Sequence, residues 1–284
     1  MVKMEQEFQS PAKVNLRLEI LHKRKDGYHE LRMINTLVSL CDTIRIRLVE
    51  KGIVLHAFDD PQVPSGEENI AYRACKEILA YSNKNVGVEI DLVKTIPSAA
   101  GLGGGSSNAA TVLIALNQML KIGLTKDKIM KIGLKLGTDV PFFLLGATTA
   151  LATGIGERLT KIKAMPKLNF LIVVPRLAVS SAWAYQEYRG APRTELEELP
   201  LVYRTKKAVT KIMLNDLEKV TEKRYPVITK IKDALMSSGA LGAQMSGSGP
   251  SVFGVFAGKA EAEDALSTFT ARHSNWRCYL AESL

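Results

Sequence analysis

The sequence predicts an α+β fold made of two domains. Segments with the period of strands and segments with the period of helices are mixed along the chain and do not alternate strictly, which disfavours a doubly wound parallel sheet. At about 150 residues per domain, the length of 284 residues favours about two domains or one large α/β unit. A polar stretch with little periodicity begins near residue 176. We therefore expect an N-terminal domain over residues 1–165 and a C-terminal domain over residues 166–284.

The first half of the chain alternates strand and helix signals around a glycine-rich loop. Apolar residues at every second position predict strands at residues 13–21, 43–50 and 86–96. Helical spacing predicts helices at residues 69–82, from the glycine loop to about Leu120, and from an N-cap at Thr125 to about Gly137. The uncharged stretch at residues 140–156 is short and polar for a membrane span, so we interpret it as buried core.

The second half is richer in helices. A run of β-branched residues predicts a buried strand at 168–175, and residues 190–207 show little periodicity. Further on, the pattern predicts helices at 207–223, 226–238 and 259–272, a strand, glycine turn and strand at 243–258, and a closing strand at 276–283.

Charge and cysteine usage limit the classes of function. The chain carries 38 Lys and Arg against 29 Asp and Glu, a formal net charge of +9. Such a charge is compatible with a polyanionic small substrate, a membrane surface or nucleic acid, but the basic residues are scattered and form no stripe. A basic nucleic-acid-binding module without catalysis remains the alternative from another class, and its binding would weaken steeply with salt.

The cysteines and the N-terminus predict a cytoplasmic protein. Cys41, Cys75 and Cys278 are far apart and outside any metal-binding or disulfide spacing. The four histidines are dispersed as well. The first ten residues, MVKMEQEFQS, have neither the apolar core of a signal peptide nor the Arg- and Ser-rich character of a transit peptide. We expect no dedicated metal site, no membrane partner and no nucleic-acid partner, and a monomer or weak homodimer.

The stretch PSAAGLGGGSSNAA at residues 97–110 is the strongest functional signal. A helix N-terminus offers unpaired N–H groups and a positive dipole end, and glycines before it let phosphate oxygens approach the backbone. Four glycines followed by Ser106 and Ser107 suit the phosphates of a nucleotide. The alternative is a glycine turn that serves close packing only. No Lys follows the last glycine, as a Walker loop requires, and Ser106 stands where a Rossmann loop needs its third glycine.

This loop resembles the central motif of the GHMP kinases, the superfamily of galactokinase and of homoserine and mevalonate kinases. SPAKVNLRLEILHKRKDGYHEL at 10–31 and LGTDVPFFLLG at 136–146 are similar to the members that act on 4-diphosphocytidyl-2-C-methyl-D-erythritol. MSGSGPSVFGVF at 245–256 resembles the third glycine motif of the superfamily. The small residues Ser98, Ala99 and Ala100 replace the Met and glycines of some relatives. The resemblance implies a two-domain fold with the active-site cleft between the domains.

The resemblance implies that Asp139 is the catalytic base and Lys13 its partner. An ammonium within hydrogen-bond reach keeps a carboxylate ionised and can polarise the acceptor oxygen. Without the resemblance, Asp139 would be taken as a solvated or helix-capping residue and Lys13 as an exposed strand edge. Asn15, two residues further on, shares a strand face with Lys13 and can orient the substrate.

Substrate and nucleotide residues follow from the same resemblance. It implies that Tyr28 and His29 hold a cytosine and that Tyr185 supplies an aromatic face to it, whereas Tyr28 and His29 alone would be read as a surface cap. SGSGPS at 246–251 is either a tight hairpin or a wall of the phosphate site. The residues expected to bind ATP are Pro97, Ser98, Ala99, Ala100, Gly101, Leu102, Gly103, Gly104, Gly105, Ser106 and Ser107.

The implied activity is an ATP-dependent small-molecule kinase. It would transfer the γ-phosphate of ATP to the 2-hydroxyl of 4-diphosphocytidyl-2-C-methyl-D-erythritol in non-mevalonate isoprenoid synthesis. Another kinase of the superfamily, acting on homoserine or mevalonate, is the nearer alternative, although those substrates carry no base for Tyr28, His29 and Tyr185 to hold. Mg²⁺ is expected with ATP, held mostly by phosphates, water and Ser107.

Overall fold

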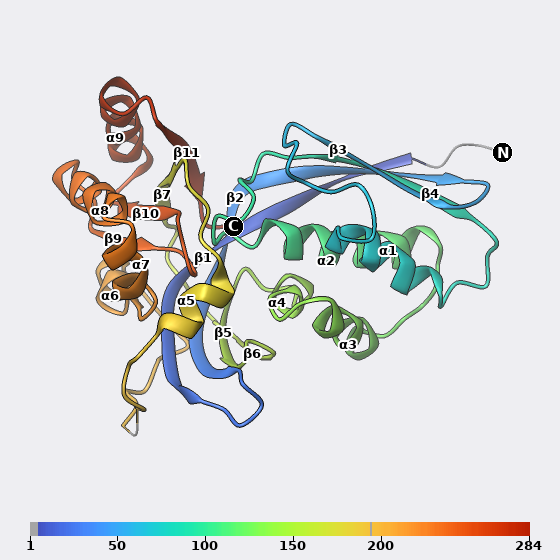
Figure 1. The fold of residues 1–284 in the computed structure, drawn as a ribbon, viewed down its shortest axis with the longest axis horizontal. Helices are drawn as coiled ribbons and strands as arrows, with labels where there is room; N and C mark the ends of the chain where they lie inside the picture. The colour runs from blue at the N-terminus through green and yellow to red at the C-terminus, as the bar shows by residue number, and fades with distance from the viewer. Residues whose placement is uncertain (1–4, 194) are drawn as a thin grey trace. The chain divides into compact units, whose positions relative to one another are not determined.

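The computed structural model describes residues 5–193 and 195–284, which fold into two compact units (Figure 1). The first unit takes the chain up to Ala12, Cys41–Ser98 and Gly103–Gly146, and the second takes Lys13–Leu40, Ala99–Leu102 and Ala147–Leu284. The units interleave along the sequence, whereas the expected boundary between residues 165 and 166 divides it once. That boundary stays a prediction. The first four residues of the N-terminal segment lie outside the described residues.

In the first unit, helices cover one face of a sheet. The C-terminal part of β2 (His29–Val49) pairs antiparallel with β4 (Gly87–Val93), which pairs parallel with β3 (Ile53–Phe58). Side chains along β2 and β4 alternate between the two faces of the sheet. Those on the helix side form a core with the helices and include Ile44, Ile46, Ile90 and Leu92. These helices are α1 (Ile70–Leu79), α2 (Gly104–Met119), α3 (Lys126–Leu136) and α4 (Val140–Leu144), and Figure 1 shows α1 and α2 along the sheet.

The second unit holds an antiparallel sheet of order β11-β7-β10-β9. Its strands are β7 (Asn169–Pro175), β9 (Gly242–Met245), β10 (Val252–Phe256) and β11 (Trp276–Glu282). Helices α8 (Val227–Ser237) and α9 (Lys259–Arg272) pack on this sheet through Ile231, Leu235 and Phe269 (Figure 1).

Further strands of the second unit extend the long strands β1 and β2. β1 (Glu5–Lys23) pairs parallel with the short β8 (Leu214–Asn215), and β2 pairs antiparallel with β5 (Thr149–Gly154), which pairs with β6 (Arg158–Lys161). The remaining helices are α5 (Ser181–Glu187), α6 (Lys206–Lys211) and α7 (Glu218–Arg224).

Most predicted elements are present, and one predicted helix is wrong. The strands and helices expected up to Gly137 are confirmed, including the cap at Thr125, whose side chain accepts from the N–H of Lys128. The helix expected at 207–223 is instead α6, β8 and α7. α6 ends at Lys211, and the next segment, Leu214–Asn215, pairs with β1 as β8. The side chain of Asn215 accepts from the N–H of Leu217 just before α7, so a strand pairing and a local turn interrupt the helix.

Elements without a clear sequence period were missed. The stretch at 140–156, interpreted as core, is largely buried but forms α4 and β5. β2 begins at His29, much earlier than expected, and β3 and α5 were not predicted. No helix in residues 5–193 and 195–284 combines the length and the apolar character needed to cross a membrane.

Candidate active site

Lys13 and Asn15 form a buried polar pair on β1. Lys13 is 4% exposed, and its Nζ donates to Asn15 Oδ1 over 2.6 Å. The Nδ2 of Asn15 donates to Asn35 Oδ1 on β2, also over 2.6 Å. Because Asn35 takes the amide nitrogen, the amide oxygen of Asn15 faces the ammonium. Lys13 is therefore not an exposed strand edge, and Asn15 contacts and orients it.

The second unit brings part of the glycine loop against β1 and the SGSGPS segment. The N–H of Lys13 donates to the carbonyl of Leu102 over 2.9 Å. Ser246 Oγ donates to the carbonyl of Gly101 over 2.9 Å and accepts from the N–H of Asn15 over 3.3 Å. A Cβ on Gly101 would lie 2.1 Å from the carbonyl oxygen of Ser246. Gly101 thus permits a close approach of two backbone segments. The SGSGPS segment connects the antiparallel strands β9 and β10, so it is a hairpin turn, and its role as a wall of the phosphate site stays a prediction.

The rest of the glycine loop begins α2 in the first unit. Gly103 caps the helix with φ +70°, a left-handed conformation that favours glycine. A Cβ on Gly104 would lie 3.0 Å from Ile96 Cγ2, whereas one on Gly105 would make an ordinary 3.4 Å contact with Ile70. Gly103 and Gly104 therefore also serve backbone conformation and packing. The first N–H groups of α2 have no intrahelical acceptor, so this exposed end can bind an anion.

Asp139 belongs to a segment that passes the start of α2. It directly precedes α4, yet its side chain makes no capping hydrogen bond, so the capping interpretation is not supported. A Cβ on Gly137, two residues earlier, would lie 3.9 Å from Ser106 Oγ. The segment that carries Asp139 therefore passes next to the first turn of α2. Ser107, in contrast, is fully buried, and its hydroxyl accepts from Ser10 over 2.8 Å.

An aromatic cluster stands in the second unit where the base-binding residues were expected. His29 stacks on Tyr185 with ring centroids 5.5 Å apart and an angle of 23°. Tyr188 meets His29 edge-on at 6.3 Å. Tyr28, at the turn before β2, is 56% exposed. Burial and the nearby charge of Lys23 lower the pKa of His29, which favours the neutral imidazole with one donor and one acceptor.

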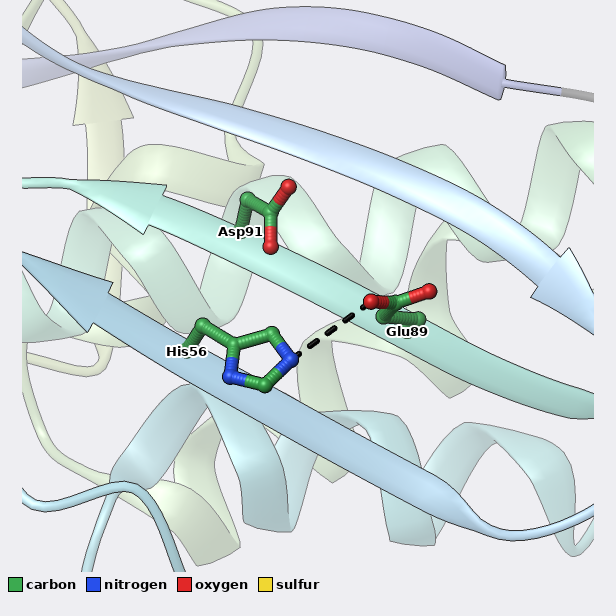
Figure 2. Close-up of side chains that lie close together, drawn as sticks. All are labelled: His56, Glu89 and Asp91. Carbon is green, nitrogen blue, oxygen red and sulfur yellow. Dashed lines mark ion pairs between the residues drawn. The ribbon is translucent and has the colours of Figure 1, made fainter.

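One group of side chains in the described part of the chain places potential metal ligands close together: His56, Glu89 and Asp91 (Figure 2). They project from β3 and β4, with His56 Nε2 3.5 Å from a carboxylate oxygen of Glu89. Arg47 already pairs with both carboxylates, over 3.0 Å to Glu89 and 2.8 Å to Asp91. A cation would have to displace this guanidinium, so the cluster is a surface ion-pair network.

Several contacts that shape the site were not predicted from the sequence. Asn215 Nδ2 donates to the carbonyls of Met245 and Gly247 over 2.8 Å each and so fixes the SGSGPS segment. Ser248 shares a 2.8 Å hydrogen bond with Ser181, the first residue of the helix that carries Tyr185. These contacts join residues far apart in the chain, and no local period signals them. Tyr188 alone had a signal, since it follows Tyr185 by three positions on the same helix end.

The comparisons with known proteins identify the class. Residues 69–147 match the model of the GHMP kinases N terminal domain, and residues 200–275 match that of the GHMP kinases C terminal domain. The chain belongs to the GHMP kinases, and it is an ATP-dependent small-molecule kinase of the α+β class, as predicted.

Individual relatives indicate which member of the superfamily the chain is similar to. The chain is 49% identical over 267 residues to 4-diphosphocytidyl-2-C-methyl-D-erythritol kinase of Geobacter metallireducens, covering 94% of each chain. It is 40% identical over 278 residues to the kinase of the same name from Acetivibrio thermocellus, covering 96% of this chain and 97% of the relative. A crystal structure of 4-(cytidine 5'-diphospho)-2C-methyl-D-erythritol kinase superimposes with a TM-score of 0.83 at 34% identity, covering 98% of both chains. Homoserine kinase from Cytophaga hutchinsonii, at 19% identity and a TM-score of 0.72, shares the fold.

Proposed function

We propose that this kinase transfers the γ-phosphate of ATP to the 2-hydroxyl of 4-diphosphocytidyl-2-C-methyl-D-erythritol, giving the 2-phosphate and ADP. The reaction would serve isoprenoid biosynthesis in the cytoplasm. The observation that carries the choice of substrate is the stack of His29 on Tyr185, with Tyr188 at its edge. Homoserine and mevalonate contain no aromatic ring that could stack on this cluster, whereas cytosine is such a ring. The names of the relatives support the same choice.

Phosphoryl transfer asks the protein mainly to position the acceptor and to stabilise charge. In this proposal, Asp139 accepts the proton of the 2-hydroxyl, and the buried Lys13 stabilises charge on the reacting oxygens. Asn15 holds the ammonium of Lys13 through its amide oxygen over 2.6 Å. The N–H groups of Gly104, Gly105 and Ser106 at the start of α2 bind phosphate oxygens.

Magnesium fits the oxygen groups at the start of α2. The half-buried hydroxyl of Ser106 lies beside the segment that carries Asp139. Because Ser107 is buried and bonded to Ser10, Ser106 is the better placed hydroxyl to contact the ion. The ion would neutralise phosphate charge when bound, and it would keep most of its other ligands as water and phosphate.

The test is a comparison of acceptors. The full cytidyl substrate, a uridine analogue and 2-C-methyl-D-erythritol 4-phosphate are compared by kcat/KM on the unchanged enzyme and on Tyr185→Leu. Stacking on a nucleobase contributes about 1 to 3 kcal/mol, so removal of the cytidyl group should lower kcat/KM more than about tenfold. Uridine should also be poor, because it replaces the exocyclic amine donor by an acceptor.

The variant sharpens this comparison. Tyr185→Leu should impair the cytidyl substrate far more than the stripped one. Tyr81→Leu is the matched control, since Tyr81 is an exposed tyrosine of the first unit, packed beside Lys128; all three acceptors should behave on it as on the unchanged enzyme. Equal efficiencies for the three acceptors would disprove cytidine recognition and leave a GHMP kinase with another substrate.

A further inference from the structure

A single carboxylate, that of Asp42, gathers four donors in the core of the first unit. Asp42 has no exposed surface. Its Oδ1 accepts from the backbone N–H groups of Thr95 and Ile96 over 2.8 Å each. Its Oδ2 accepts from Asn108 Nδ2 over 2.9 Å and pairs with the ammonium of Lys94. A carboxylate with this many donors is held in one orientation.

The donors come from both sides of the glycine loop. Thr95 and Ile96 lie between the end of β4 and Pro97, and Asn108 lies in the second turn of α2. Asp42 itself lies in β2, which forms the sheet beneath them. The two segments that enter and leave the loop are therefore fixed to one point of the sheet.

A chain of hydroxyls extends the network along α2. Asn108 Nδ2 donates to Ser10 Oγ over 3.0 Å, and Ser10 donates to Ser107 Oγ over 2.8 Å. The side-chain amide of Asn108 can take only this orientation, because the opposite one would turn its oxygen toward the carboxylate of Asp42. The first turns of α2 are thereby tied to β1 as well as to β2.

The charge of Lys94 gives the carboxylate a second task. Lys94 is buried, and its ammonium lies at the positive end of α2. A Cβ on Gly104 would be only 3.3 Å from this ammonium. An unpaired ammonium there would be unfavourable, and Asp42 compensates it. A buried ion pair adds little stability over apolar residues of similar size, so stability alone does not explain why this pair stands at the loop.

We propose that Asp42 is a positioning residue for the phosphate loop, acting through Lys94, Asn108 and Ser10. It fixes the spacing between the exit of β4 and the start of α2, so that the N–H groups of Gly104, Gly105 and Ser106 point at the phosphates before the nucleotide binds. This inference rests on the proposed phosphate-binding function of the loop.

The test separates nucleotide affinity from stability. ADP affinity is measured by calorimetry, and the melting temperature in parallel, for Asp42→Asn and for the double variant Asp42→Asn with Lys94→Met. Asp42→Asn should lower both, with ADP binding at least about tenfold weaker. The double variant removes the unpaired ammonium, so its melting temperature should recover in part while ADP affinity stays low. Recovery of ADP affinity together with the melting temperature would overturn the proposal.

Further variants keep the test decisive. Should Asp42→Asn fail to fold, Ser10→Ala disturbs the same network without a change of charge. This variant should weaken ADP binding about fivefold, and unchanged affinity would count against the proposal.

The matched control is Glu19→Gln, which changes another buried acid in ion pairs with Arg17 and Arg32. It should lower the melting temperature and leave ADP affinity within about twofold, and an equal loss of affinity would mean that any buried ion pair has this effect.

A pair of loop variants shows which hypothesis fails. Gly105→Pro removes one N–H of the loop, and Gly105→Ala keeps it. If Gly105→Pro weakens ADP binding and Asp42→Asn does not, the positioning role alone is wrong. If none of these variants changes ADP affinity, the loop does not bind phosphate and both proposals fail.

Discussion

At the scale of residues, burial and partners give Lys13 a role that its sequence context leaves open. A strand period places Lys13 and Asn15 on one face, which the structure bears out with a 2.6 Å contact. The sequence does not show that Asn35 and Ser246 contact Asn15, because these partners lie 20 and 231 residues away. The motif residues were therefore predictable, and the contacts between them were not.

Replacing Asp139 by Asn tests the assigned base. The change keeps the shape and removes the negative charge, and loss of general acid/base assistance lowers turnover by about 10²- to 10⁴-fold. Because Asn is close to Asp in size, the melting temperature and ADP affinity should change far less than turnover. Steady-state kinetics and thermal melts check this prediction.

Asp127→Asn is the control for that change. Asp127 is an exposed acid in the first turn of α3, in the same unit, and its replacement should leave turnover nearly unchanged. Near-normal turnover in Asp139→Asn would refute its role as the base. A large fall in its melting temperature would point to a structural role instead.

At the scale of elements, periodicity predicted what local sequence determines. The 3.6-residue spacing of residues 70–79 and the cap at Thr125 are local signals, and both elements are present. α6, β8 and α7 were merged into one helix because the two residues of β8 between the helices pair with β1, a partner far along the chain. β2 begins at His29 because it pairs with β5 from Leu31 onward, and no local period marks that pairing.

The phosphate role of the first turn of α2 is testable at Gly105. Proline in the first turn of a helix removes an N–H that has no intrahelical acceptor, so it costs the helix little. Gly105→Pro should therefore weaken ADP binding by about tenfold while the melting temperature changes little. Gly105→Ala keeps the N–H, and its Cβ has room at 3.4 Å from Ile70, so it should bind ADP almost as the unchanged enzyme does. Equal ADP affinities in the two variants would mean that this N–H makes no phosphate contact.

At the scale of the whole molecule, the two compact units do not follow the order of the sequence. β1 and β2 contribute residues to both units, and so does the glycine loop, with residues 99–102 in the second unit and its ends in the first. A sequence read from one end to the other suggests a single boundary, because pattern changes are visible only locally. The mixed order of strand and helix periods gave the α+β class and the motifs gave the family, whereas the assignment of each strand to a unit depends on pairings between distant segments.

The acid stability of the fold depends on a second buried carboxylate, Glu19. Burial alone would raise its pKa, but hydrogen bonds and charge from Arg17 and Arg32 outweigh burial and lower the pKa from 4.5 to about 2. Arg193 adds a third cation at 3.6 Å. Because the folded pKa lies below the unfolded one, this stabilisation is complete above pH 4.5 and is lost as the pH falls toward 2.

Glu19→Gln should flatten this acid dependence. The free energy of unfolding is measured by denaturant titration at pH 6 and pH 3 for both proteins. The unchanged enzyme should lose up to about 3 kcal/mol from this group over the full acid range, and part of that by pH 3. The variant starts less stable at pH 6, because it leaves the cations of Arg17 and Arg32 buried without their carboxylate, and it should lose less between the two pH values. The same loss in both proteins would show that other carboxylates, not Glu19, set the acid limit of the fold.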